Sequence, residues 1–132
     1  MQTLDHITLV VSDYDRSKKF YERALSPLGI TAIMEFGQAC GFGHAQKPEF
    51  WIGAGPASFH TPEQLRTITP IHVAFVARSR TEVDAFHAAA LAAGGSDFGA
   101  PGLRPHYHPG YYGAFVLDPD GHDIEAVFHG AP

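Results

Sequence analysis

The chain has 132 residues, 45% hydrophobic and 12% aromatic, and is therefore long and apolar enough to bury one packed core. Its formal net charge of -5 predicts no basic surface for nucleic acid or for an anionic membrane. The single cysteine, Cys40, excludes an intrachain disulfide, and the amino terminus shows no secretory signal pattern. With no apolar run near the roughly 20 residues of a membrane span, we expect a cytoplasmic protein.

The first predicted elements are a strand over residues 4–11 and a helix directly after it. Alternation in the strand places His6 on one face and apolar residues on the other, where they should meet the core. Ser12 and Asp15 have the spacing of a capping box, which predicts the start of the helix.

Three short apolar clusters follow at residues 30–34, 39–42 and 50–52, each bounded by glycine, proline or glutamine. This rhythm is typical of three short strands in a meander. The next segment, 56–69, is polar and has no period, so we interpret it as a linker between two halves of the chain.

The second half repeats the first. At one constant offset, His72 corresponds to His6, Phe86 to Phe20, and Gly95 to Gly29. Its predicted helix also has capping residues, Ser79 and Glu82. We therefore expect an α+β fold, a single domain over 1–132, in which two βαβββ modules, 1–55 and 70–129, are related by a pseudo-twofold.

The end of the chain should form an antiparallel pair of strands. A loop is expected over 99–110, then a strand over 111–117, a turn at Asp118-Pro119-Asp120-Gly121, and a last strand over 123–128. Alternation in the last strand places Asp123, Glu125 and Val127 on one face.

Three side chains are unusual for the wall of a sheet: His6, His72 and Glu125. If the modules pair symmetrically, the two histidines converge and the glutamate completes the set. Two imidazoles and one carboxylate suit one divalent ion of Fe, Mn, Ni or Zn, and leave open positions for substrate oxygens. Taken singly, each histidine is equally compatible with a hydrogen-bonded structural role.

The segments 4–13 (LDHITLVVSD), 71–75 (IHVAF) and 115–125 (FVLDPDGHDIE) resemble the vicinal oxygen chelate superfamily, which includes glyoxalase I, extradiol dioxygenases and bleomycin-resistance proteins. The resemblance implies an open, barrel-like sheet of eight strands with helices outside, and often a homodimer. It also implies metal ligands on the first and last strands of each module, at positions that match His6, His72 and Glu125. Whether the ligands come from one chain or two stays open.

The fourth ligand position of this superfamily falls on Trp51, which cannot bind a metal. Glu49, two residues earlier on the same face, is a possible substitute. The departure favours the three-ligand members of the superfamily, such as the dioxygenases, over glyoxalase I.

The remaining candidates lie mostly in the loop after residue 103 and on the strand that follows it. We expect His106 and Tyr112 to be catalytic, and five residues to bind a small-molecule substrate: Trp51, Arg104, Tyr107, His108 and Tyr111. The leading hypothesis is a metal-dependent, dioxygenase-like enzyme acting on a small oxygen-bearing molecule. The alternatives are a glyoxalase-like lyase or isomerase and a non-catalytic binding protein of the bleomycin-resistance type, with a planar ligand over Trp51.

Overall fold

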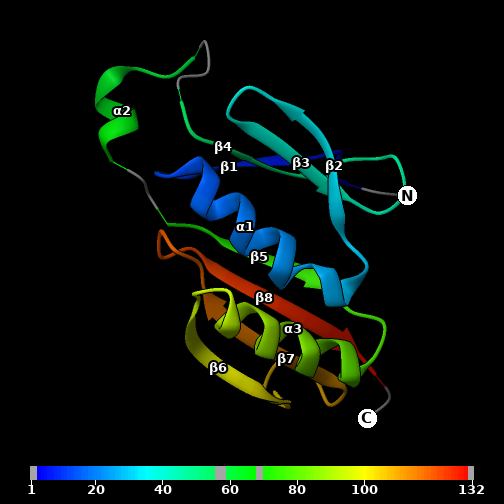
Figure 1. Cartoon of the computed structure of the whole chain (residues 1–132). Helices are drawn as coiled ribbons and strands as arrows, with labels where there is room; N and C mark the ends of the chain where they lie inside the picture. The colour runs from blue at the N-terminus through cyan, green and yellow to red at the C-terminus, as the bar shows by residue number, and fades with distance from the viewer. Residues whose placement is uncertain (1–2, 56–58, 68–69, 131–132) are drawn as a thin grey trace.

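Each half of the chain forms one strand, one helix and three further strands (Figure 1). The computed structural model describes residues 3–55, 59–67 and 70–130. The first module contains β1 (Ile7–Val10), α1 (Tyr14–Ala24), a 3-10 turn (Ser26–Leu28), β2 (Thr31–Phe36), β3 (Ala39–Gly43) and β4 (Phe50–Gly53). The second module contains β5 (His72–Val76), α3 (Arg80–Ala92), β6 (Ser96–Leu103), β7 (Tyr111–Leu117) and β8 (Asp123–His129).

The two modules have the same sheet topology. The strand orders are β1-β4-β3-β2 and β5-β8-β7-β6, and in each sheet the first strand runs parallel to the last while the other pairs are antiparallel. This confirms the predicted α+β fold of two βαβββ modules. The eight strands divide into two four-stranded sheets.

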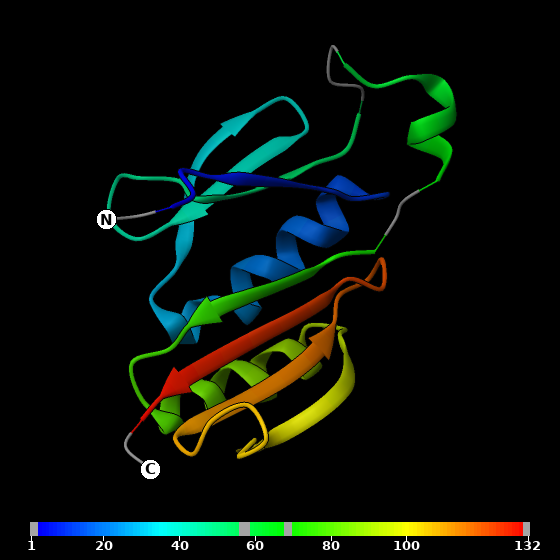
Figure 2. The same cartoon turned by 180° about the vertical axis from the view of Figure 1, so that it is seen from behind.

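Both long helices lie on the same side of the sheets, and the strands of both modules lie in front of them when the molecule is seen from behind (Figure 2). The helix α1 contacts β4, while α3 contacts β7 and β8. The helices also contact each other. Each sheet therefore has one face under a helix and one face without a helix.

The predicted alternation holds in both first strands. In and beside β1, Leu9 and Val11 are buried, whereas His6 is exposed just before the strand begins. In β5, His72 is exposed and the chain becomes buried at Ala77. Apolar residues therefore face the core, and both histidines lie on the side away from it.

The predicted start of α3 is confirmed, whereas the predicted start of α1 is wrong. Ser79 is the N-cap of α3, and its side chain accepts a hydrogen bond from the amide of Glu82, as expected. The prediction for α1 was wrong by one residue, because Asp13 is the N-cap. Ser12 instead donates its amide and its hydroxyl to the Asp120 carboxylate in the second module.

The helix α2 was not predicted, and the strand β6 was predicted as part of the second module but without its position. The helix α2 (Pro62–Arg66) lies within the expected linker, where Thr61 and Gln64 form a complete capping box; the linker residues 56–58 and 68–69 lie outside the described residues. The strand β6 extends into the expected loop, and shifts of its pairing register on β7 accommodate its glycines. No helix of the described ranges is long and apolar enough to cross a membrane.

The turn between β7 and β8 joins the two modules. The buried Asp118 carboxylate accepts the Tyr21 hydroxyl of α1 at 2.5 Å, and it accepts the amides of Asp120 and His122 at 2.9 Å each. One carboxylate thus connects a helix of the first module to a turn of the second. Because these groups are buried, each needs its partner.

His122 makes a second connection in the same turn. Its Nδ1 accepts the amide of Ile71 at 3.1 Å, so its proton lies on Nε2, which donates to the carbonyl of Val10 at 2.9 Å. His122 is 1% exposed. This imidazole holds the end of β1 beside the start of β5, and so the predicted turn is also a structural junction.

Candidate functional site

The helix-free face of the second sheet brings His72 and Glu125 together. They lie on the adjacent parallel strands β5 and β8, and His72 Nε2 is 2.8 Å from Glu125 Oε1. The Glu125 side chain is 1% exposed, whereas the His72 side chain is 53% exposed. A buried carboxylate therefore meets an imidazole that solvent can reach.

Tyr111 completes this group from β7. Its hydroxyl donates to Glu125 Oε2, the oxygen that His72 does not contact. Burial, together with this hydrogen bond, raises the pKa of Tyr111 above its ordinary value. Tyr111 therefore remains a protonated donor at neutral pH and holds one carboxylate oxygen while the other faces His72.

Tyr112, which was expected to be catalytic, lies on the other face of the sheet. Its hydroxyl donates to Asp84 Oδ1 of α3 at 2.7 Å, so it lies between the sheet and the helix. Tyr111, expected to bind substrate, is the tyrosine beside Glu125. Alternation shows that the two tyrosines face opposite ways, but the pairing of Phe115 with Glu125 decides which one faces the glutamate.

Asp123 lies directly opposite His72 in the strand register. Its Oδ2 is 3.9 Å from His72 Nε2, and its Oδ1 is buried with no hydrogen-bond partner among the described residues. Burial raises the pKa of Asp123. Alternation in the last strand predicted that Asp123 shares a face with Glu125, but it did not predict that Asp123 lies beside His72.

His6 shares a cavity with His72. The cavity, of about 320 Å³, lies where β1 and β5 approach each other, and Glu49 also lines it. His6 Nδ1 is 2.7 Å from Asp5 Oδ1, which Lys47 Nζ also contacts at 2.6 Å. The hydrogen bonds from Lys47 and His6 lower the pKa of Asp5, so this carboxylate is ionised and accepts from His6 Nδ1.

The structure thus brings His72 and Glu125 into contact and places His6 on the same cavity wall as His72. Across the described ranges, no three His, Cys, Asp or Glu side chains are grouped closely enough to hold a metal ion. The three-ligand site of His6, His72 and Glu125 stays a prediction.

The loop after Arg104 forms an aromatic cluster against Tyr111. The rings of Tyr107 and His108 lie 4.9 and 5.4 Å from the Tyr111 ring, centre to centre. His108 Nε2 is 2.8 Å from His129 Nδ1, a contact that the sequence spacing did not reveal. His106, the other expected catalytic residue, is exposed and its ring lies 4.2 Å from that of Tyr107.

Arg104 is folded back over its own strand. Its Nη1 and Nη2 donate to the carbonyls of Gly102 and Ala100, both at 2.8 Å. The guanidinium lies 5.5 Å from the centre of the Phe115 ring. Phe115 also contacts the His72 ring at 6.1 Å, so one phenyl ring is a neighbour of both residues.

Trp51 forms an aromatic shelf on the first module. Its indole is nearly parallel to the Phe36 ring, with an interplanar angle of 13° and centres 6.1 Å apart. Gly41 lies opposite Trp51 on β3, and a Cβ atom there would come within 2.7 Å of the indole. A cavity of about 460 Å³ lies beside the shelf, lined by Phe36, Gly53 and neighbouring residues.

Replacing Gly41 with alanine is expected to displace the indole, because real Cβ contacts are not that short. Trp51 is the only tryptophan, so its emission spectrum reports the change directly. Gly53→Ala on the next strand is the matched control, since its new Cβ would meet nothing closer than 3.8 Å. Equal emission spectra for Gly41→Ala and wild type would contradict the described packing.

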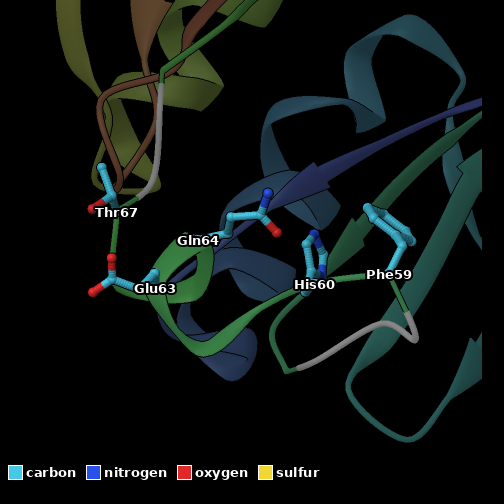
Figure 3. Close-up of a pocket in the computed structure, with 5 residues that line it drawn as sticks. All are labelled: Phe59, His60, Glu63, Gln64 and Thr67. Atoms are coloured by element: carbon cyan, nitrogen blue, oxygen red, sulfur yellow. The ribbon is translucent and has the colours of Figure 1, made fainter.

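A further cavity, of about 530 Å³, lies against α2, and Figure 3 shows the five residues that line it: Phe59, His60, Glu63, Gln64 and Thr67. The rings of Phe59 and His60 are 4.3 Å apart. None of the predicted site residues lines this cavity.

Comparisons with known proteins agree with the fold. The family model of the Glyoxalase/Bleomycin resistance protein/Dioxygenase superfamily matches residues 3–126. A glyoxalase/bleomycin resistance protein from Albidiferax ferrireducens is similar at 30% identity and a TM-score of 0.78, over 98% of this chain and 100% of that one. A search of the curated proteins finds no significant match.

Two further solved structures share the fold at lower identity. A glyoxalase/bleomycin resistance protein/dioxygenase family enzyme from Burkholderia phytofirmans is 20% identical, with a TM-score of 0.73 over 98% of this chain and 100% of that one. A glyoxalase-related enzyme from Fulvimarina pelagi is 24% identical, with a TM-score of 0.68 over 97% of this chain and 88% of that one.

Proposed function

Because the chain belongs to the Glyoxalase/Bleomycin resistance protein/Dioxygenase superfamily, we propose that it is a metal-dependent enzyme acting on a small, oxygen-bearing organic molecule. The observation that carries the proposal is the contact between His72 Nε2 and the buried Glu125 Oε1 at 2.8 Å. Burying a carboxylate costs folding free energy, and here Tyr111 also holds its second oxygen. Such a buried, oriented carboxylate is typical of a functional site.

The donor atoms of His72 and Glu125 are of the kinds that bind a divalent metal ion. Imidazole nitrogen and carboxylate oxygen are ligands of Fe, Mn, Ni and Zn, and two ligand atoms bound to one such ion lie about 3 Å apart, close to the separation of these two. Asp123 is a further carboxylate next to His72, because its Oδ2 lies 3.9 Å from His72 Nε2. Its Oδ1 is buried and has no hydrogen-bond partner in the described part of the chain. A bound ion would act as a Lewis acid toward substrate oxygens.

The residues of the chain itself prepare this site. Tyr111 holds Glu125 Oε2 and thereby directs Oε1 toward His72. Asp5 accepts from His6 Nδ1 and leaves Nε2 free to act as a ligand, the usual arrangement behind a metal-binding histidine. We propose His6, His72 and Glu125 as the ligands, as in the three-ligand dioxygenase-like members.

Glu49 is our candidate for a fourth ligand, because it lines the same cavity as His6 and His72. Trp51 lies on its aromatic shelf against Phe36, and an indole offers no metal-binding atom. The cytoplasmic location and the homodimer stay predictions.

Metal binding tests the proposal. We expect the wild type to bind one equivalent of Fe(II), Mn(II), Ni(II) or Zn(II). Removing an outer partner of a ligand lowers metal affinity by up to about 100-fold, and we expect His72→Ala and Glu125→Gln to lower it by more than this. His44→Ala replaces an exposed histidine outside the site and should bind as the wild type does. The proposal fails if the wild type binds no stoichiometric metal, or if His72→Ala binds it equally well.

A second candidate is a non-catalytic protein that binds a planar molecule, and the parallel Trp51 and Phe36 rings beside a cavity favour it. Such binding should quench Trp51 emission, survive a chelator and persist in Glu125→Gln. Turnover that depends on metal would exclude this alternative. Both the dioxygenase-like enzyme and a glyoxalase-like isomerase require the ion, so the product of the reaction distinguishes these two.

A further inference from the structure

Arg104 is fixed in one position on the face that carries His72 and Glu125. Its two carbonyl contacts, to Gly102 and Ala100, hold both ends of the guanidinium fork. The Phe115 ring supports the plane of the fork. Phe115 pairs with Glu125 across the strands, and directly opposite residues point to the same face of a sheet.

Among the residues that the structure describes, no carboxylate is paired with the charge of Arg104. Within the described part of the chain its polar contacts are the two carbonyls, and no carboxylate forms an ion pair with it. A guanidinium has five N–H donors, so donors remain available on both Nη atoms and on Nε. A fixed, half-buried cation with free donors is a recognition group for an anion.

The neighbouring charges indicate which kind of anion fits. Asp123 and Glu125 are carboxylates of the same face, so a ligand with two or more negative charges would be repelled. A single carboxylate matches the single guanidinium in both charge and fork geometry.

We propose that the substrate is a small aromatic or similarly planar carboxylic acid, whose carboxylate binds Arg104 and whose oxygen-bearing end lies at His72 and Glu125. Phe115 contacts both Arg104 and His72, so the two ends of the ligand are separated by about the span of one ring. This proposal rests on the proposed function and specifies the substrate class of that same site.

The experiment compares benzoate with benzamide, its uncharged counterpart, on metal-free protein in the presence of EDTA. Binding is followed by chemical shifts of the Phe115 amide and of the Arg104 side chain. The wild type should bind benzoate at least about tenfold more tightly than benzamide, the ratio that a charge-assisted pair supports. Arg104→Gln should bind both with the affinity that the wild type has for benzamide.

The matched control is Arg80→Gln. Arg80 also lies over an aromatic ring, 5.0 Å from the centre of Tyr112, but on the face that α3 covers. It should keep the wild-type preference for benzoate. Arg104→Lys, which keeps the charge and loses the fork, should retain part of the preference, and it serves as the test variant if Arg104→Gln does not fold.

Several results would overturn the proposal. These are no saturable binding of benzoate by the wild type, an unchanged preference in Arg104→Gln, an equal loss in Arg80→Gln, or tighter binding of phenyl phosphate than of benzoate. Because EDTA is present, the outcome does not depend on metal binding. A protein that discriminates benzoate through Arg104 but binds no metal would contradict the proposed function alone.

Discussion

Replacing Asp118 with alanine is expected to lower the free energy of unfolding by about 2–4 kcal/mol, because it leaves buried donors without their acceptor. The carboxylate is 5% exposed and accepts the Tyr21 hydroxyl and two amides of its own turn. Burial raises the pKa of Tyr21, and the nearby Asp118 charge adds to this effect, so Tyr21 remains a hydroxyl that needs an acceptor.

Urea unfolding measures this effect. Asp97→Ala is the matched control, because Asp97 also accepts a side-chain and an amide hydrogen bond, from His87 and Gly99, but at an exposed position. It should destabilise the protein much less. In a double-mutant cycle, Tyr21→Phe should cost less in the Asp118→Ala background than in the wild type. Equal destabilisation by the two aspartate variants would contradict the junction role of Asp118.

Replacing Tyr111 with phenylalanine is expected to weaken metal binding by about 10–100-fold, the usual cost of removing a partner that orients a ligand. The change removes the hydroxyl that holds Glu125 Oε2 and leaves that buried oxygen without its donor. The carboxylate is then free to rotate, and Oε1 no longer has a fixed direction toward His72.

Tyr112→Phe is the control for this prediction, since it removes one hydroxyl from the neighbouring residue on the opposite face of the sheet. Calorimetric titration with the metal that the wild type binds should show little change for Tyr112→Phe. A larger loss for Tyr112→Phe than for Tyr111→Phe would make Tyr112 the functional tyrosine and would contradict the role of Tyr111 in orienting Glu125.

Local patterns predicted much of the fold. The repeat of His6 at His72 indicated two modules, and alternation indicated that both histidines face away from the core. Ser79 was recognisable as an N-cap because capping depends on a few adjacent residues. Ser12 was misread as a cap because its hydrogen bonds go to Asp120, a residue 108 positions away.

The helix α2 and the position of β6 were not predicted, because they depend on tertiary contacts or on irregular pairing. The helix α2 has only five residues and no apolar period, so its Thr61 cap was the one local signal for it. The strand β6 contains three of the glycines and prolines that usually mark loops, and its shifted register on β7 allows it to pair nonetheless.

The sequence by itself determined the duplicated module and the alternation of side chains between the two faces of each strand, because the two-residue period of a strand is a local property. Only the tertiary structure decided that Glu125 meets His72 and Tyr111, and that Arg104 lies over Phe115. These contacts depend on strand order and register, which are set by turns and packing between distant segments.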